Sequence, residues 1–289
     1  MSDNKAKDLI GAIKEKGRKL EAEMSFFDHI DALRKHLLRA LAVVLVFTAG
    51  AFYYTDFIFN TVIMGPINPR FWTYRMMCKI YERFPSIGEE FCIKTIEAKI
   101  INTEMSGQFT LQLNACVMAG LILGIPYLLF EIWLFIRPAL HETERKSASG
   151  FVAFASLLFF TGILFGYYII CPLSVNFLIN FKVSPDIENT FTIDSYLSTV
   201  MTLTLGSGII FQLPVVIYIL SKVGIMTPAF MRSSRRYAAV IILIVAAVVT
   251  PTADPFTMLT VALPLFLLYE ISIYISANIE RKRKKALAS

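Results

Sequence analysis

Long apolar segments alternate with shorter polar ones along this chain, and within each segment the apolar residues follow one another directly. Leu41–Val46 and Val240–Val249 are continuously apolar, whereas the strands of an outer-membrane barrel alternate apolar and polar residues with a period of two. Continuous apolar runs of this kind are typical of helices that span a membrane. The pattern therefore predicts an all-α, polytopic membrane protein.

Six apolar segments predict six transmembrane helices, of which we expect the last two to be short. Their approximate bounds are Leu37–Phe59, Phe109–Ile136, Gly150–Ile170, Tyr196–Leu220, Tyr237–Thr250 and Phe256–Ala277. We expect Cys171-Pro172 to stop the third helix and Asp194-Ser195 to cap the start of the fourth.

The fifth segment is too short for an ordinary span. Its 14 residues, Tyr237–Thr250, reach about 21 Å at about 1.5 Å per residue, against a hydrocarbon core of about 30 Å. Either this helix turns at Pro251–Pro255 in a hairpin that does not fully cross, or the bilayer is locally thinned, or the helix continues for a turn into the flanking polar residues.

Lys and Arg residues are concentrated in alternate loops. Nine lie in the arm up to Arg39, three in Arg137–Lys146, four in Lys222–Arg236 and five from Arg281 onward, against six in Arg70–Lys99 and one at Lys182. Because cytoplasmic loops carry the excess of positive charge, both termini are predicted to be cytoplasmic.

This topology divides the chain into three parts. Residues 1–24 form a basic cytoplasmic arm, residues 25–277 a six-helix membrane domain with an extracytoplasmic loop at about 56–108, and residues 278–289 a basic cytoplasmic tail. The first apolar run begins near Leu37, so we expect the first span to act as its own insertion signal. The arm either lies on anionic lipid or extends into solvent.

Composition narrows the classes of function. Of 289 residues, 56% are hydrophobic and 17% are charged, against about 25% charged in soluble domains, which excludes a soluble enzyme with one large core. The net charge is +6, but the Lys and Arg residues lie beside apolar spans and do not form a basic stripe that would bind nucleic acid. The histidines His29, His36 and His141 lack metal-ligand spacing and no catalytic motif is present, so we expect no enzyme, cofactor or metal site.

Four cysteines fall into two pairs by position. Cys78 and Cys92 lie in the predicted extracytoplasmic loop, where an oxidising compartment would let them form a disulfide, although two unpaired thiols remain the alternative. Cys116 and Cys171 lie in or beside spans, and we expect them to be small core residues.

Several polar residues lie at membrane depth, where a charge costs about 2.5 to 3.5 kcal/mol and requires a reason. They are Glu131 in the second span, Gln212 in the fourth, Glu270 in the sixth and Asp254 at the tip of the short hairpin. Together they indicate a polar recess within the bundle. The alternative for each is an interhelical hydrogen bond or a side chain that reaches toward the interface.

Before the first span, Ser25–Asp28 reads as a capping box that opens a helix. Phe26, Ile30, Leu33 and Leu37 then recur at helical spacing, which predicts an interfacial amphipathic helix.

Ser25–Leu37 also resembles the N-terminal signature of the TatC family, the multispanning subunit of the twin-arginine protein translocase. Trp133–Leu140 followed by Glu144-Arg145 is similar to the first cytoplasmic loop of that family. Further matches are Phe211–Pro214, Thr250-Pro251 with Asp254, and Leu268–Glu270. The resemblance covers about residues 25–276, with the motifs in the family's order.

The resemblance implies a function in the bacterial inner membrane. TatC proteins bind the Arg-Arg signal peptides of folded precursors and nucleate a translocation site for export driven by the proton gradient. The implied partners are single-span TatA-type and TatB-type proteins, the precursors, membrane lipid and further copies of the chain. The signal-peptide residues implied here are Glu144, Arg145, Arg34, His29, Asp28, Phe135, Pro138 and Leu140.

Two positions depart from the family pattern. Ala32 stands where the family has glutamate, and Asp31 is rotated from it by about 100° on a helix. Either Asp28 supplies the second carboxylate or Glu144 binds the arginines with less help. Gln212 stands where well-known members have glutamate and cannot titrate, which leaves Glu270 for any step that needs a proton.

The alternative function is a proton-coupled secondary transporter of a small solute, with Glu131 and Glu270 as relay groups. The cytoplasmic motifs and the lack of an evident inverted repeat favour the translocase. An intramembrane enzyme lacks a nucleophile with a base.

Overall fold

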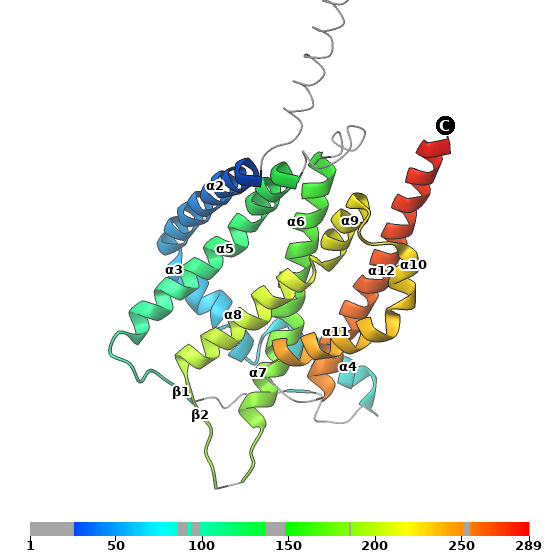
Figure 1. Cartoon of the computed structure of the whole chain (residues 1–289). Helices are drawn as coiled ribbons and strands as arrows, with labels where there is room; N and C mark the ends of the chain where they lie inside the picture. The colour runs from blue at the N-terminus through cyan, green and yellow to red at the C-terminus, as the bar shows by residue number, and fades with distance from the viewer. Residues whose placement is uncertain are drawn as a thin grey trace, which may run out of the picture.

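The computed structural model describes residues 26–85, 92–93, 99–136, 148–184, 186–250 and 255–288. These residues form a bundle of long helices (Figure 1). We call the end where the first helix begins and the last helix finishes the terminal end, and the opposite end, where two short strands lie, the loop end. Within the described residues, five helical segments are long and apolar enough to cross a membrane: Ile30–Tyr53, Gly107–Ile136, Gly150–Asn180, Ile193–Lys222 and Thr257–Arg281.

The first span is one continuous helix. Helix α2 (Phe26–Tyr53) joins the predicted amphipathic segment to the span without a break, so the span does not begin as a separate element near Leu37. It also ends six residues before Phe59, and the chain continues through α3 (Thr55–Phe57), the π-helical segment η1 (Ile58–Ile63) and the 3-10 turn η2 (Gly65–Ile67). The capping residue Ser25 lies outside the described residues.

Helix α5 (Gly107–Ile136) packs along α2, and two glycines set the distance between them. A Cβ atom on Gly120 would lie 2.7 Å from the backbone nitrogen of Thr48, and one on Gly124 would lie 2.6 Å from a methyl group of Val44. At Gly120 the two backbones therefore approach so closely that only glycine fits, and at Gly124 a Cβ would displace the Val44 side chain.

The third span does not stop at Cys171-Pro172. Helix α6 (Ala148–Phe165) leads through the π-helical segment η7 (Gly166–Ile170) into α7 (Cys171–Asn180), with Pro172 in the first turn of α7. Proline is tolerated in a first turn because its missing N–H would have no helical partner there. The prediction that this dipeptide ends the helix was therefore wrong.

The fourth span is broken in two. Helix α8 (Ile193–Ile210) ends at a turn formed by Phe211 and Gln212, and α9 (Leu213–Val223) begins with Pro214 in its first turn. The cap of α8 is Thr192, whose hydroxyl accepts the Ser195 N–H at 3.3 Å, so the predicted cap at Asp194-Ser195 was wrong by two residues.

The last three helices are α10 (Pro228–Ser233), α11 (Arg235–Val249) and α12 (Pro255–Ala288). Helix α11 has 15 residues and is short, as expected. Helix α12 has 34 residues, which contradicts the expectation that the last helix is also short, because it continues past Ala277 along the basic tail.

The loop end is a structured cap. Helix α4 (Trp72–Arg83) is tied to the rest of the cap by a disulfide between Cys78 and Cys92, with Cα atoms 4.3 Å apart. Strand β1 (Lys99–Ile101) pairs in parallel with β2 (Thr190–Thr192), a small sheet that the all-α expectation did not contain. The predicted loop 56–108 is therefore largely regular structure where it is described.

Tyr74 fastens α4 to the bundle. Its ring is fully buried and its hydroxyl donates to the carbonyl oxygens of Pro66 at 2.8 Å and Pro172 at 3.0 Å. Burial raises the pKa of this hydroxyl above its ordinary value, so it remains a donor. Thr73 adds a hydrogen bond to the carbonyl oxygen of Tyr168.

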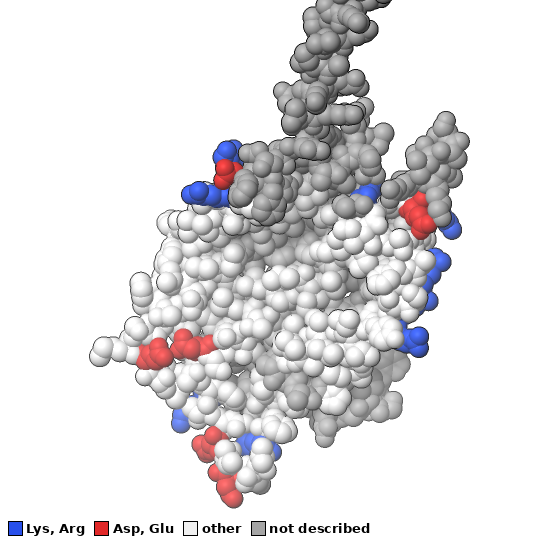
Figure 2. Space-filling model, in the orientation of Figure 1, with Lys and Arg blue, Asp and Glu red and all other residues white. Residues whose placement is uncertain are grey.

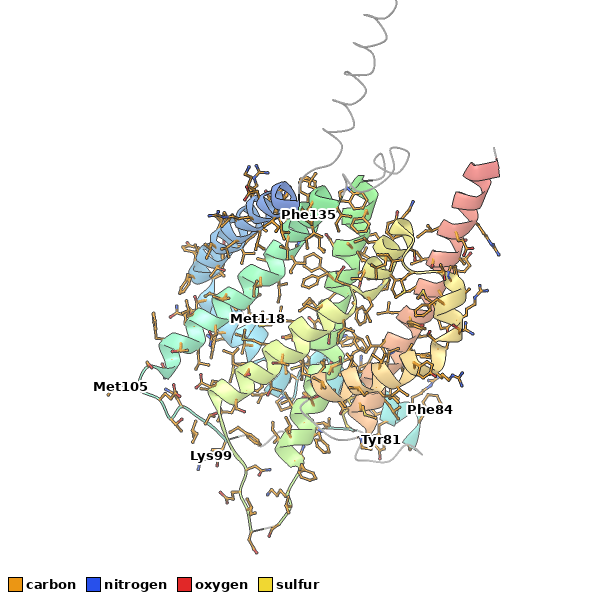
Figure 3. The ribbon with its side chains drawn as sticks, viewed as in Figure 1. Tyr81, Phe84, Lys99, Met105, Met118 and Phe135 are labelled. Atoms are coloured by element: carbon orange, nitrogen blue, oxygen red, sulfur yellow. A yellow bond between two sulfur atoms is a disulfide. The ribbon has the colours of Figure 1, made fainter. Side chains whose placement is uncertain are left out.

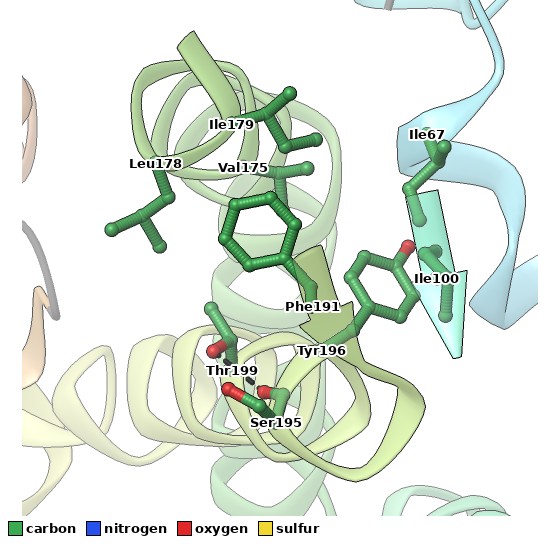
Figure 4. Close-up of a pocket in the computed structure, with 9 residues that line it drawn as sticks. All are labelled: Ile67, Ile100, Val175, Leu178, Ile179, Phe191, Ser195, Tyr196 and Thr199. Atoms are coloured by element: carbon green, nitrogen blue, oxygen red, sulfur yellow. Dashed lines mark hydrogen bonds between the residues drawn. The ribbon is translucent and has the colours of Figure 1, made fainter. Parts of the chain in front are cut away.

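The largest core cluster is centred on α8. Val200 and Leu203 are buried there in one cluster with Ala246 of α11 and Leu265 of α12. At the loop end, Phe191 lines a small cavity of about 40 Å³ together with residues of α7 and α8 and with Ile67 and Ile100 (Figure 4). A gap of this size holds no more than a few waters, and it is therefore a packing defect.

Charged side chains gather at the two ends of the molecule and along one side, over α10 and α11 (Figure 2). A broad uncharged band lies between them on the face shown. Bands of this kind match the hydrocarbon region of a bilayer.

Candidate functional site

The terminal end contains a polar cluster around one buried carboxylate, and this cluster joins α2 to α5. We call it the His36 cluster; its members are His36, Tyr127, Glu131 and Phe135. The last three follow one another at four-residue spacing, so α5 presents them on one face. Figure 3 places Phe135 near the end of α5, at the terminal end of the bundle.

Glu131 is the centre of this cluster. Its side chain is 3% exposed, and each carboxylate oxygen has a donor: the Nδ1–H of His36 at 2.5 Å and the hydroxyl of Tyr127 at 2.6 Å. The ring of Phe135 packs edge-on against the imidazole with centroids 6.3 Å apart. A carboxylate can be buried when its oxygens are paired in this way, and the pairing fixes α2 against α5.

Aromatic rings connect α5, α6 and α9 near the terminal end. Trp133 of α5 stacks on Phe151 of α6 with centroids 4.3 Å apart, and Phe151 packs on Tyr218 of α9 at 5.6 Å. The end of α5 and the start of α6 are therefore both anchored. Residues 137–147 connect these two anchored points.

Four of the residues that the family resemblance implies for signal-peptide binding lie in that connection, outside the described residues. They are Pro138, Leu140, Glu144 and Arg145. Asp28 and His29 belong to the first turn of α2, but the structure does not describe their side chains. Arg34 is exposed on α2, and Phe135 belongs to the His36 cluster.

Three of the polar residues at membrane depth each make a separate contact, and the predicted recess stays a prediction. Gln212 donates through Nε2 to the carbonyl oxygen of Ala155 at 3.0 Å, and Glu270 forms an ion pair with Arg235 at 2.8 Å. Glu131 is bound within the His36 cluster, and no hydrogen bond or ion pair joins any two of these three described residues. Each follows the alternative of an individual interhelical contact, and Asp254 lies outside the described residues.

The cysteines differ in the same way as their positions suggested. Cys78 and Cys92 form the disulfide of the loop end, and Cys116 and Cys171 are free and buried.

Sequence reasoning missed two members of the His36 cluster. His36 was noted for lacking metal-ligand spacing and as a member of the Ser25–Leu37 signature, and Tyr127 was not singled out. The four-residue spacing of Tyr127 and Glu131 was a usable signal for their contact. No local signal shows that Glu131 meets His36, which lies 95 residues away in the sequence.

The comparisons with known proteins agree on one family. A family model described as "Sec-independent protein translocase protein (TatC)" matches residues 28–264. The chain is 36% identical over 261 residues to the TatC protein of Blattabacterium sp. subsp. Periplaneta americana, covering 90% of this chain and 98% of that one. It is 31% identical over 268 residues to TatCy of Bacillus subtilis, covering 92% and 94% of the two chains.

Solved structures give the same result. The chain superimposes on "Crystal Structure of Twin Arginine Translocase Receptor- TatC" with a TM-score of 0.63 and 28% identity, over 87% of this chain and 99% of that one. The same receptor in DDM gives a TM-score of 0.66 with 29% identity, over 86% and 99%. With its long apolar helices, this chain is a multi-pass membrane protein, and it belongs to the TatC family of Sec-independent protein translocase proteins.

Proposed function

We propose that this chain is the receptor of a twin-arginine translocase in a bacterial inner membrane. It binds the Arg-Arg signal peptides of folded precursors at its terminal end and nucleates the site through which the proton gradient drives export. The observation that carries this proposal is the likeness to a solved twin-arginine translocase receptor over 87% of the chain at 28% identity.

An Arg-Arg signal peptide requires carboxylates at the terminal end. Two arginines on a peptide bind best to carboxylates that accept both arms of the guanidinium. Glu131 does not serve, because both its oxygens already accept hydrogen bonds inside the His36 cluster. Glu144 is the remaining family-matched carboxylate, and Asp28 in the first turn of α2 is the candidate for a second one.

The described helices give that site a firm base. The connection that holds Glu144 starts and ends at helices α5 and α6, which the Trp133–Phe151 stack clamps together. The His36 cluster fixes α2, and with it Asp28, to the same end of α5. Binding groups on a fixed base lose less entropy when they bind a peptide.

The proposed topology has six spans with both termini in the cytoplasm, and α11 is the short span. The excess of Lys and Arg in alternate loops supports this orientation. The disulfide at the loop end supports it too, because such bonds persist in oxidising compartments outside the cytoplasm. Single-span TatA-type and TatB-type proteins and further copies of the chain complete the proposed assembly.

The first test is photo-crosslinking from position 144 in membranes, with an Arg-Arg precursor and a matched Lys-Lys precursor. Lysine keeps the charge but loses the bidentate geometry, so crosslinks to the Arg-Arg form should fade with the Lys-Lys form. A probe at Glu104, an exposed glutamate of the loop end, is the matched control and should capture neither. Equal crosslinking of both precursors, or of neither, would contradict a twin-arginine site at Glu144.

The companion variant is Glu144→Ala. Export of an Arg-Arg precursor should be lost while the chain still inserts in the membrane, and Glu104→Ala should export normally. Both results are read from the amount of mature precursor outside the cytoplasm and of the chain in the membrane. Unchanged export in Glu144→Ala would count against the receptor site.

The described contacts do not favour the transporter alternative. A proton relay needs Glu131 and Glu270 to communicate, and each is bound to a different partner on a different helix.

A further inference from the structure

Two adjoining cavities lie between the first span and the middle of α5. Their volumes are about 480 Å³ and about 590 Å³, within the range of roughly 300 to 1,000 Å³ that is usual for small-molecule sites. Both are lined by Phe57, Val62, Met118, Ile122 and Tyr167, so they meet at these five residues, and we call the two together the groove. Figure 3 shows Met118 near the middle of α5.

The groove is apolar and opens sideways. Phe57 of α3 is 60% exposed and Leu164 of α6 is 54% exposed, and both lie at its edge. Exposed apolar side chains beside a cavity in a transmembrane bundle face lipid, because water is absent from the hydrocarbon core. The groove is therefore accessible from the bilayer.

One end of the groove is polar and basic. Asn68, Arg70 and Trp72 line the larger cavity where the chain enters α4. Asn68 accepts the backbone N–H of Arg70 at 2.9 Å, and the exposed Arg70 guanidinium has no hydrogen bond or ion pair with any residue that the structure describes. Trp72 is half exposed and packs edge-on against Tyr168. Tryptophan is enriched at membrane–water interfaces, so its place here indicates that this end of the groove lies at such an interface.

Helix α4 marks the same interface. Trp72, Met76 and Ile80 are exposed at four-residue spacing. Arg75, Lys79 and Arg83 are exposed at the same spacing beside them. An apolar stripe next to a basic stripe is the pattern of a helix that lies on an anionic membrane surface. Arg70 therefore stands at headgroup depth, with the apolar groove running from it into the hydrocarbon region.

We propose that this groove binds an anionic phospholipid of the leaflet at the loop end. The Arg70 guanidinium binds the phosphate, and one acyl chain occupies the cavity beside Met118 and Ile122. The site lies away from the terminal end and does not depend on signal-peptide binding. A test of lipid binding therefore does not test the proposed function.

The dimensions favour a lipid over a partner helix. One turn of an α-helix about 10 Å wide and 5.4 Å long occupies roughly 420 Å³. The two cavities together would thus hold fewer than three helical turns, too few for a helix that spans a membrane, whereas an acyl chain is a single methylene wide and fills a narrow groove along its length. The Arg70 guanidinium, which pairs with none of the residues that the structure describes, also matches a phosphate, which it binds through two parallel hydrogen bonds.

Native mass spectrometry of the full chain in mild detergent tests the headgroup. Phosphatidylglycerol should stay bound at concentrations where phosphatidylcholine of the same chain length does not. Arg70→Gln should lower phosphatidylglycerol occupancy about tenfold, while Arg70→Lys should retain most of it. Lys99→Gln is the control, because Lys99 is also an exposed basic residue of the loop end and lines neither cavity.

The acyl chain is tested by filling the groove. Ile122→Trp should displace the lipid, and Leu113→Trp, an exposed position on the same helix outside both cavities, should not. A single gel-filtration peak and an intact Cys78–Cys92 disulfide verify that each variant folds. If Ile122→Trp keeps full occupancy, or if glycerol phosphate alone competes as well as the lipid, no acyl chain occupies the groove and the proposal is wrong.

Two other outcomes would also overturn it. The first is equal binding of both lipids with no effect of Arg70→Gln. The second is a photo-crosslink from position 118 in membranes that yields a single-span protein in place of a lipid adduct, which would assign the groove to a partner helix.

Discussion

At the scale of single residues, Glu131 shows how a charge can lie inside a transmembrane helix. Two donors from two helices satisfy its carboxylate, so it is a structural contact between α2 and α5. From the sequence alone, Glu131 could belong to a polar recess, to the proton relay of a transporter or to an interhelical hydrogen bond.

Replacing His36 should show how much this contact contributes to the free energy of unfolding. His36→Ala leaves the Glu131 carboxylate with one donor, and losing a hydrogen bond to a charged group costs roughly 1.5 to 3 kcal/mol. Unfolding in mixed micelles measures the loss. Lys35→Ala, an exposed neighbour on α2, is the control and should change stability by less than about 0.5 kcal/mol. Equal stabilities of the two variants would show that the pair contributes nothing.

Depth in a span was enough to single out Glu131, Gln212 and Glu270, because any polar residue there needs a partner. Their partners were not predictable. The carbonyl of Ala155 and the guanidinium of Arg235 become neighbours of these residues only when helices pack, and no spacing rule reports that.

At the scale of elements, the α2–α5 contact depends on glycine. Gly120→Ala should push the helices apart, because the new Cβ would meet the backbone of Thr48 at 2.7 Å, and overpacking of this kind destabilises by about 1 to 3 kcal/mol.

Gly50→Ala is the matched control on α2. Its Cβ would meet no heavy atom within 4 Å, and alanine is the better helix former, so stability should stay equal or rise slightly. Thermal unfolding in detergent compares the two variants. A Gly120→Ala protein as stable as Gly50→Ala would mean that the helices can separate freely at this crossing.

The apolar pattern located the spans well, and it missed the breaks inside them. A proline marks a place where a helix lacks an N–H, but packing decides whether the helix ends there. Pro172 follows a π-helical segment, in which Gly166 lies so close to α8 that a Cβ would come 2.7 Å from the Leu203 carbonyl oxygen. Pro214 instead begins a new helix after the turn at Gln212. From the sequence we expect a helix end at Pro172 and a continuous span through Pro214, and packing reverses both expectations.

At the scale of the whole molecule, the disulfide reports which way the chain crosses the membrane. Denatured without reductant from intact cells, the chain should label with maleimide at two thiols, Cys116 and Cys171, and at four after reduction. The reason is that Cys78 and Cys92 oxidise only if the loop end leaves the cytoplasm. Labelling of all four thiols without reductant would contradict the proposed orientation.

The arrangement of the ends follows from the alternation of apolar and basic segments. Figure 1 places the start of α2, the end of α5, the start of α6 and the end of α12 at the terminal end. The small sheet and α4 were not predictable in the same way, because the first depends on pairing between distant segments and the second lies in a loop that hydropathy reads only as polar.

The parallel pairing of β1 with β2 also sets an order for biosynthesis. Lys99 pairs with Thr190, and the hydroxyl of Tyr196 reaches the carbonyl oxygen of Ile63 across 133 residues. A nascent chain that has emerged only as far as α7 therefore carries an unpaired strand edge and an open loop end. These contacts form only when β2 and α8 have been synthesised, so the loop end cannot fold completely before the fourth span emerges from the ribosome.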